Sequence, residues 1–143
     1  MRKTVIIPAY NEAKTLREII RRVQAMSIAD EILVVDDGSV DGTGEILSEY
    51  KAPCPVRVIT HAHNQGKGAA VRTGIQAATG EVIIIQDADL EYDPRDYPAL
   101  LRPIEEGIAE VVFGSRFLGG ARRPVMFWHM VAKFIGVFMV STP

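Results

Sequence analysis

The stretch EVIIIQDADLEYDP, residues 81–94, joins one of the most apolar runs of the chain to four carboxylates within seven residues. The unbroken apolar run predicts a strand buried on both faces, which is typical of a central strand in a parallel sheet. The carboxylates that follow belong to Asp87, Asp89, Glu91 and Asp93. Like charges crowded at the end of a buried strand repel one another. The segment is therefore either an acidic polar loop or a cation site.

Short apolar runs alternate with segments of helical period on both sides of this stretch. Strands are predicted at 4–10, 31–37, 55–60, 81–86 and 110–116. Helices are predicted between them, at 13–26, 41–50, 68–78 and 96–106, with Asn11 as the N-cap of the first. Strand–helix alternation of this kind predicts an α/β fold with a mostly parallel central sheet and right-handed crossovers.

Polar side chains gather directly after the predicted strands. In α/β sheets, ligands bind beyond the carboxyl ends of the strands. The segments at those ends are Asn11-Glu12, Asp36 to Ser39, His61 to Lys67, Asp87 to Asp89, and Ser115-Arg116. This edge of the sheet is therefore the expected active face.

Two acidic pairs, Asp36-Asp37 and Asp87/Asp89, follow different strands and are expected to converge. A hard divalent ion, Mg²⁺ or Mn²⁺, prefers oxygen ligands and takes one or two carboxylates together with ligand phosphates. Asp87 and Asp89 are two residues apart in an extended segment, so their side chains point the same way. The small Ala88 between them lets a bulky ligand approach closely. We expect a metal site here.

Other polar positions leave two interpretations open. HNQGKGAA (63–70) lacks the P-loop spacing and is either a turn into a helix that packs closely on the sheet or a loop that closes over a ligand. Arg116 either contacts a phosphate or is an exposed arginine at a strand end. His61 and His63 have no partner at zinc-ligand spacing and are expected to be solvated.

The composition is that of one globular domain of 143 residues, 48% of them hydrophobic, with a net charge of −2. This near-neutral balance gives no electrostatic footprint for nucleic acid, so no nucleic-acid partner is expected. The single cysteine, Cys54, excludes an internal disulfide framework and fits a reducing compartment. The first apolar run is too short for a signal peptide, so we expect a cytoplasmic location.

The C-terminal run VMFWHMVAKFIGVFMV, residues 125–140, is apolar apart from His129 and Lys133. It is a little short for a membrane-spanning helix. It is expected to be either an interfacial amphipathic segment or an ordinary buried helix. The end of the sequence looks like a cut inside a longer protein. We therefore divide the chain into a domain at 1–120 and the start of an apolar, membrane-interfacial segment at 121–143.

The motifs resemble those of a known family. VIIPAYNE (5–12), VVDDGSVDGT (34–43), NQGKGAAVRTG (64–74), QDADLEYDP (86–94) and FGSRFLGG (113–120) occur in the order and spacing of the family 2 glycosyltransferases. Within that family the chain is most similar to the dolichol-phosphate mannose synthase group, the polyprenyl-phosphate glycosyltransferases. The resemblance covers residues 3–120 and implies the GT-A fold, a Rossmann-like three-layer sandwich.

The resemblance implies roles for the donor-site residues. The base and ribose of a nucleoside-diphosphate sugar would contact Pro8, Tyr10, Glu12, Val35 and Asp37. Metal and diphosphate would be bound by Asp87, Ala88 and Asp89.

The metal and acceptor residues follow from the same resemblance. Asp89 and Glu91 would be the direct metal ligands, although many relatives carry Gln at the latter position. Arg116 would contact the diphosphate or the acceptor phosphate. His129 and Lys133 are the candidates for the basic acceptor-site residues of relatives.

The implied function is metal-dependent, inverting transfer of a hexose, mannose or glucose, from GDP-mannose or UDP-glucose to a polyprenyl phosphate of the dolichyl or undecaprenyl type. The enzyme would be peripheral on the cytoplasmic face of a membrane. The alternatives are a family 2 enzyme with a hydroxyl acceptor, a sugar-nucleotide nucleotidyltransferase and an inactive donor-binding relative. The nucleotidyltransferase would need a Gly-rich basic loop where PAYNE stands. A receiver-like signalling domain would need an aspartate after the third strand, where His61 stands.

Overall fold

The computed structural model describes residues 1–50, 56–114 and 138–141. The elements in chain order are β1 (Lys3–Ala9), α1 (Leu16–Ala25), β2 (Glu31–Asp36), α2 (Thr43–Leu47), β3 (Val56–Thr60), α3 (Lys67–Ala77), β4 (Val82–Ile85), the 3₁₀ turn η1 (Pro94–Asp96), α4 (Tyr97–Glu105), β5 (Val111–Phe113) and β6 (Phe138–Ser141). The alternation predicted from the sequence is confirmed.

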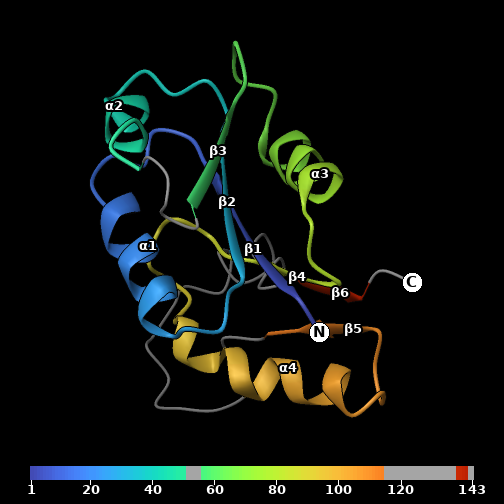
Figure 1. The fold of residues 1–143 in the computed structure, drawn as a ribbon. Helices are drawn as coiled ribbons and strands as arrows, with labels where there is room; N and C mark the ends of the chain where they lie inside the picture. The colour runs from blue at the N-terminus through green and yellow to red at the C-terminus, as the bar shows by residue number, and fades with distance from the viewer. Residues whose placement is uncertain (51–55, 115–137, 142–143) are drawn as a thin grey trace, which may run out of the picture.

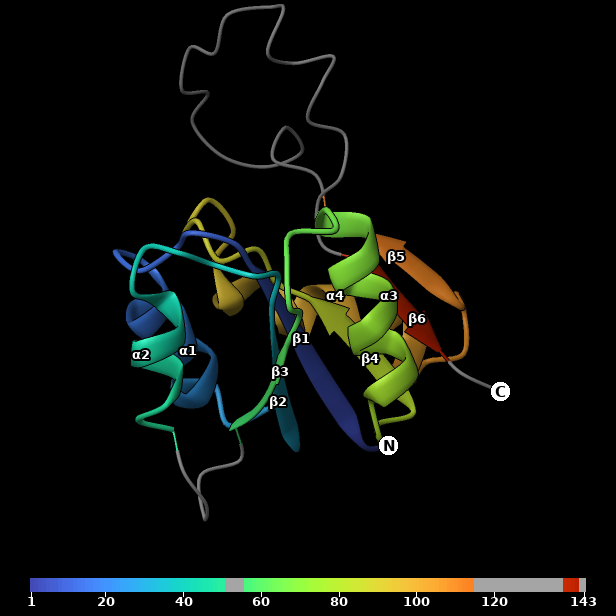
Figure 2. The same cartoon turned by 90° about the horizontal axis from the view of Figure 1, so that it is seen from above.

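These strands form one sheet in the order β3-β2-β1-β4-β6-β5. β1 pairs in parallel with β2 and with β4, and β2 pairs in parallel with β3. β6 runs antiparallel between β4 and β5. Helices α1, α2 and α4 cover one face of the sheet and α3 covers the other, which gives three layers (Figures 1 and 2).

The spacing of apolar residues explains the packing of both faces. In α1 the buried residues are Leu16, Ile19, Ile20 and Val23, one face of the helix. On the other side α3 presents small residues, and a Cβ at Gly74 would lie 2.5 Å from Ile6 Cγ2. The close packing of this helix on β1 therefore depends on the glycine.

The start of the first helix differs from the prediction. α1 begins at Leu16 after Thr15, so Asn11 is not its N-cap. Asn11 has a φ of 54°, and its Oδ1 accepts a hydrogen bond from the backbone N–H of Val40 at 2.9 Å. A side chain that bonds a neighbouring loop leaves the first helical turn without this cap.

The end of the apolar C-terminal run also differs from the prediction. Phe138–Ser141 is a strand that pairs with β4 and β5, not part of a helix. A short apolar run fits a buried helix or a buried strand equally well, and only the pairing partners distinguish them. The remainder of that run, including His129 and Lys133, lies outside the described residues.

Among the helices that the structure describes, none is long and apolar enough to cross a membrane.

Candidate active site

A cavity of about 280 Å³ opens at the carboxyl ends of β1, β2 and β4. It is lined by Pro8, Ala9, Tyr10, Glu12, Asp37, Asn64, Lys67, Ala70, Asp87, Ala88 and Asp89. The residues come from four separate segments, which parallel pairing brings to one edge of the sheet. This is the edge at which the sequence predicted the polar chemistry to gather.

The loop after β1 is tied to the loop after β2. The backbone N–H of Asn11 donates to Ser39 Oγ at 3.0 Å, and that of Glu12 donates to Thr43 Oγ1 at 3.1 Å. The reverse bond runs from the Val40 N–H to Asn11 Oδ1. These three bonds hold Tyr10 and Glu12 against the cavity.

Tyr10 and Glu12 form the β1 side of the cavity. The Tyr10 side chain is exposed, which leaves its ring free to stack on a flat ligand. Glu12 accepts a hydrogen bond from Thr15 Oγ1 at 3.0 Å, which fixes its carboxylate at the entrance to α1. A stacking ring beside a fixed acceptor suits a nucleobase and its sugar.

Asp37 is buried and anchors the loop before α3. Its Oδ1 lies 2.6 Å from His61 Nδ1 and accepts a bond from the Gln65 N–H at 3.0 Å. Its Oδ2 accepts a bond from the Gly66 N–H at 2.8 Å. Burial by itself raises the pKa of Asp37, but the bonds from His61, Gln65 and Gly66 outweigh it, so the pKa lies below its ordinary value. The carboxylate is therefore held ionised by loop 61–66.

His61 differs from its predicted role as a solvated histidine. Its side chain is 9% exposed, and Nε2 lies 2.9 Å from Thr73 Oγ1 on α3. The ring thus joins the end of β2 to the middle of α3. His63, in contrast, is exposed, as predicted.

The two acidic pairs do not converge as a single cluster. β1 lies between β2 and β4 in the sheet. Asp36 is buried and accepts a bond from the Ser39 N–H at 3.1 Å, so only Asp37 of that pair lines the cavity. Among the residues that the structure describes, no three His, Cys, Asp or Glu side chains are gathered as a ready-made metal site.

Lys67 is a cavity residue that the sequence prediction did not include. It is the first residue of α3, and its Nζ lies 2.6 Å from Asp87 Oδ1. Within the described lining it is the one cation, opposite four carboxylates. In the sequence, Lys67 stands in NQGKG at the start of the helix that follows β3. Its place in the cavity becomes clear only from the fold, which brings it beside Asp87.

The loop after β4, residues 87–92, is called the acidic loop because it crowds the carboxylates of Asp87, Asp89 and Glu91 together. Asp89 lies at the exposed rim of the cavity. Its pKa is raised, first by partial removal from solvent and then by the nearby carboxylates of Glu91 and Asp87, although the Glu91 N–H opposes the shift through a 3.0 Å bond to Asp89 Oδ1. Crowded carboxylates of this kind fit a divalent cation, which would remove their repulsion. With two carboxylates from the protein, the remaining ligand positions suit phosphate oxygens and water.

Two predicted donor-site residues remain to be placed. Ala88 is buried beneath the acidic loop and lines the cavity. Val35 does not line it: its fully buried side chain packs with Ile6 and Ala70 under α3. Alternation along β2 turns the Val35 side chain toward α3, so its predicted contact with the base finds no support in this placement.

Asp93 lies at the far end of the acidic loop, outside the cavity lining. Its side chain accepts a bond from the Arg95 N–H at 3.0 Å at the start of η1. Asp93 thus serves the turn before Pro94, as expected for an Asp-Pro pair. Arg116 lies outside the described part of the chain, as do His129 and Lys133.

Comparison with known proteins identifies the family. Residues 4–140 match the profile of Glycosyl transferase family 2. The chain belongs to this family. The resemblance derived from the five motifs is thereby confirmed.

Individual relatives refine the comparison. The chain is 37% identical to a dolichol-phosphate mannosyltransferase of Pyrococcus furiosus, covering 99% of this chain and 40% of the relative. It is also 37% identical to an undecaprenyl-phosphate 4-deoxy-4-formamido-L-arabinose transferase of Salmonella choleraesuis, covering 97% of this chain and 43% of the relative. The chain thus spans less than half the length of these two proteins.

A solved structure shares the fold. The mannosyltransferase PcManGT of Pyrobaculum calidifontis, in complex with GDP-Man and Mn²⁺, matches with a TM-score of 0.73 and 25% identity. The match covers 98% of this chain and 44% of that one. The predicted GT-A architecture, with its mostly parallel sheet, is confirmed.

Proposed function

We propose that this domain is the donor-binding part of a metal-dependent, inverting glycosyltransferase that transfers a hexose from a nucleoside-diphosphate sugar to a polyprenyl phosphate. The observation that carries the proposal is the set of residues that line the cavity. Tyr10, Glu12 and Asp37 line it from the ends of β1 and β2, and Lys67 with the acidic loop lines it from the start of α3 and the end of β4. The first group of residues suits a base and ribose, and the second suits a diphosphate.

The described contacts support a nucleoside-diphosphate sugar as the donor. Asp37 is fixed by loop 61–66, so its carboxylate presents hydrogen-bond acceptors at a set position. Tyr10 supplies an exposed ring for the base. Lys67 supplies a positive charge toward the phosphates. The GDP-Man complex of PcManGT supports GDP-mannose as one candidate donor, and UDP-glucose is the other.

The acidic loop would hold Mg²⁺ or Mn²⁺ through Asp89 and Glu91. When bound, such an ion neutralises the negative charge that develops on a diphosphate leaving group. The Mn²⁺ in the PcManGT complex supports the use of a divalent cation. Asp87, paired with Lys67, would hold the donor beside the ion and shape the donor pocket.

The acceptor proposal rests on charge. A phosphate monoester has a second pKa of about 6 and is mostly dianionic at neutral pH, so it attacks without a general base. Within the described cavity lining there is no histidine, and His61 is occupied in holding Asp37. The names of the Pyrococcus and Salmonella relatives, which specify dolichol phosphate and undecaprenyl phosphate, support this acceptor class.

Arg116, His129 and Lys133 are our candidates for contacts to the acceptor phosphate. A lipid acceptor would place the protein at a membrane surface, and we propose the cytoplasmic face. The nucleotide-sugar donor is a water-soluble anion, so the donor cavity must open to the aqueous side.

An acceptor screen tests the proposal. Purified protein is incubated with radiolabelled GDP-mannose or UDP-glucose, Mn²⁺ and either polyprenyl phosphate, polyprenol or an oligosaccharide. We expect label in the lipid fraction with polyprenyl phosphate alone. Equal transfer to the free hydroxyl acceptors would contradict a phosphate acceptor. A further mixture of nucleoside triphosphate and sugar 1-phosphate that yielded sugar nucleotide would show a nucleotidyltransferase instead.

A further inference from the structure

Gln86 is a fully buried polar residue between β4 and the acidic loop. It precedes Asp87 and lies outside the cavity lining. A buried amide costs free energy unless its donors and acceptor are satisfied. The partners of Gln86 therefore show what the buried group does.

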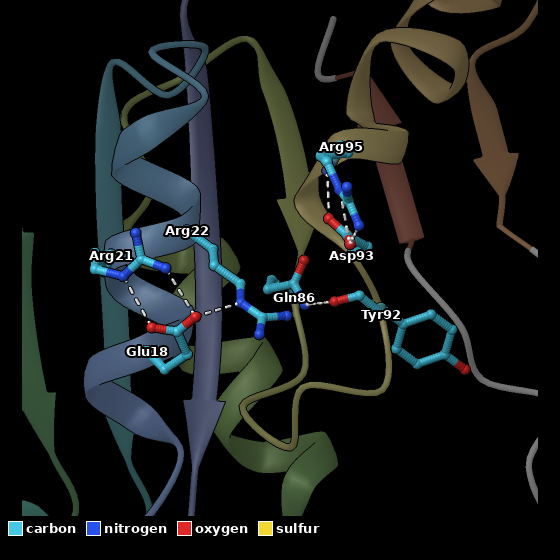
Figure 3. A network of polar contacts seen from close by, with 7 residues as sticks. All are labelled: Glu18, Arg21, Arg22, Gln86, Tyr92, Asp93 and Arg95. Atoms are coloured by element: carbon cyan, nitrogen blue, oxygen red, sulfur yellow. Dashed lines mark hydrogen bonds and ion pairs between the residues drawn. The ribbon is translucent and has the colours of Figure 1, made fainter.

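The Gln86 amide closes the acidic loop from inside. Its Nε2 donates to the backbone carbonyl of Asp87 at 3.1 Å and to that of Tyr92 at 3.1 Å. These carbonyls stand at the two ends of loop 87–92, and Figure 3 shows the bond to Tyr92. One side chain thus fixes the distance between the beginning and the end of the segment that carries Asp89 and Glu91.

Tyr97 fixes the orientation of this amide. The Tyr97 hydroxyl donates to Gln86 Oε1 at 2.6 Å, and the ring is 1% exposed at the start of α4. Burial, aided by the negative charge of Asp93, raises the pKa of Tyr97, so the phenol remains a donor. With its oxygen bound by Tyr97, the amide must direct its NH₂ toward the loop. A fully satisfied buried network of this kind is rigid.

The loop itself contains a conformation that needs such support. Leu90 has a φ of 63°, which is uncommon for a residue other than glycine. It lies between Asp89 and Glu91, and the Glu91 N–H donates to Asp89 Oδ1 at 3.0 Å. A left-handed leucine persists where the surrounding structure holds it. The Gln86 bonds at both ends of the loop provide that hold.

The far end of the loop is held by charge. Arg95 Nε and Nη2 both donate to Asp93 Oδ2, at 2.9 and 2.6 Å. Arg22 on α1, which bonds Glu18 at 2.7 Å, extends toward this end of the loop (Figure 3). These charges lie at the surface, where solvent screens them, whereas the Gln86–Tyr97 pair is buried. The buried pair therefore holds the loop more firmly than the surface charges do.

We propose that Gln86 and Tyr97 are positioning residues that pre-form the acidic loop, so that Asp89 and Glu91 are held in place before a divalent cation and diphosphate bind. The link to the cation rests on the proposed function. The closing of the loop by the buried pair does not, because it consists of hydrogen bonds within the chain.

The test uses Tyr97→Phe, which removes the hydroxyl but keeps the ring, and Gln86→Leu, which removes the whole amide. Thr4→Val is the matched control. Thr4 is equally buried and donates to Glu31 Oε2 at 2.7 Å, but it lies near the start of β1, away from the cavity at the other end of that strand. Thr4→Val loses this bond and the bond that Thr4 Oγ1 accepts from the Gly80 N–H at 2.9 Å, without touching the acidic loop.

Two measurements are made on each variant. Hydrogen exchange of the 87–92 amides is followed in metal-free protein, and Mn²⁺ affinity in the presence of GDP or UDP is measured by electron paramagnetic resonance. We expect both Tyr97→Phe and Gln86→Leu to lose amide protection in loop 87–92 and to bind Mn²⁺ about tenfold more weakly, as for partners that orient metal ligands. Thr4→Val should match the parent protein in both.

Unchanged protection in Tyr97→Phe and Gln86→Leu would overturn the inference. So would an equal loss of protection and Mn²⁺ affinity in Thr4→Val, since that would show a general effect of stability. If the parent protein bound no Mn²⁺ with either nucleotide, the proposed function would fail. The exchange experiment would then still decide whether Gln86 and Tyr97 form the loop.

Discussion

Lys67 Nζ lies 2.6 Å from Asp87 Oδ1, although the two residues are separated by β4 and most of α3 in the chain. The pair brings the single cation of the described cavity lining against the acidic loop. A charge so placed remains within reach of an anionic ligand, because the Lys67 side chain is 48% exposed.

Replacing Lys67 tests its part in nucleotide binding. We expect Lys67→Met to weaken GDP or UDP binding by about tenfold in the presence of Mn²⁺, because a hydrogen bond to a charged group contributes about 1.5–3 kcal/mol. Isothermal titration calorimetry measures the change. Lys3→Met is the control, since Lys3 is also ion-paired, to Glu105 at 3.3 Å, but lies at the start of β1, away from the cavity. Equal loss in both variants would exclude a specific role for Lys67.

Replacing His61 tests the anchoring of loop 61–66. His61→Leu leaves Asp37 and Thr73 without this partner, so the free energy of unfolding should fall by about 2 kcal/mol. Nucleotide affinity should fall as well, because the loop carries Asn64 into the cavity. Urea unfolding and calorimetry provide the two values. His63→Leu makes the same chemical change at an exposed position and should leave both values unchanged.

Glu31 predicts a pH dependence of stability. Burial alone raises its pKa, but bonds from Thr4 and Thr79 and the charge of Arg57 outweigh burial, so the pKa lies below 4.5. A pKa lowered by folding means that the stabilisation is present above pH 4.5 and is lost as the pH falls through the folded-state value. Glu31→Gln should therefore lose about 2 kcal/mol at pH 7, with the difference from the parent shrinking as the pH falls below 4.5.

Urea unfolding between neutral and acidic pH measures this difference. The exposed Glu45→Gln serves as the control for removing a surface carboxylate. A difference between Glu31→Gln and the parent that stays constant at all pH values would show that the Glu31 charge does not supply the stabilisation.

Gly38 predicts a steric requirement at the active edge. It has a φ of 74°, and a Cβ there would lie 2.6 Å from the backbone carbon of His63. Gly38→Ala should lower the melting temperature and weaken nucleotide binding, because loop 61–66 must move away. Gly42→Ala has similar strain at a φ of 94°, but its Cβ would meet only the Glu45 side chain at 3.8 Å. The difference in melting temperature and nucleotide affinity between the two variants measures the effect of the contact with the His63 backbone. Equal losses in both variants would show that backbone strain alone is responsible.

The sequence predicted the sheet because the apolar runs and helical periods are local signals. It missed β6, since a short apolar run becomes a strand only when β4 and β5 pair with it. Seven of the cavity-lining residues, Pro8, Tyr10, Glu12, Asp37, Asp87, Ala88 and Asp89, were predicted as donor-site residues through the family resemblance of the motifs.

The parts of the site that sequence reasoning missed depend on contacts across the fold. The His61 ring is covered because α3 packs against it, and Lys67 reaches Asp87 because α3 starts beside the loop that follows β4. The sequence places Gln86 as the last residue of the strand predicted at 81–86. Its bonds to both ends of the acidic loop depend on the turn at Leu90. None of these pairings has a signature in residue spacing.

The central claim, metal-dependent binding of a nucleoside diphosphate at the acidic loop, is tested most directly by calorimetry. GDP and UDP are titrated into the protein with Mg²⁺ or Mn²⁺ and again with a chelator, alongside Asp89→Ala and the exposed control Asp96→Ala. We predict binding of a nucleotide with metal, loss of that binding with chelator, and loss of the metal dependence in Asp89→Ala alone. Equal affinity with and without chelator, or normal metal-dependent binding by Asp89→Ala, would contradict the account.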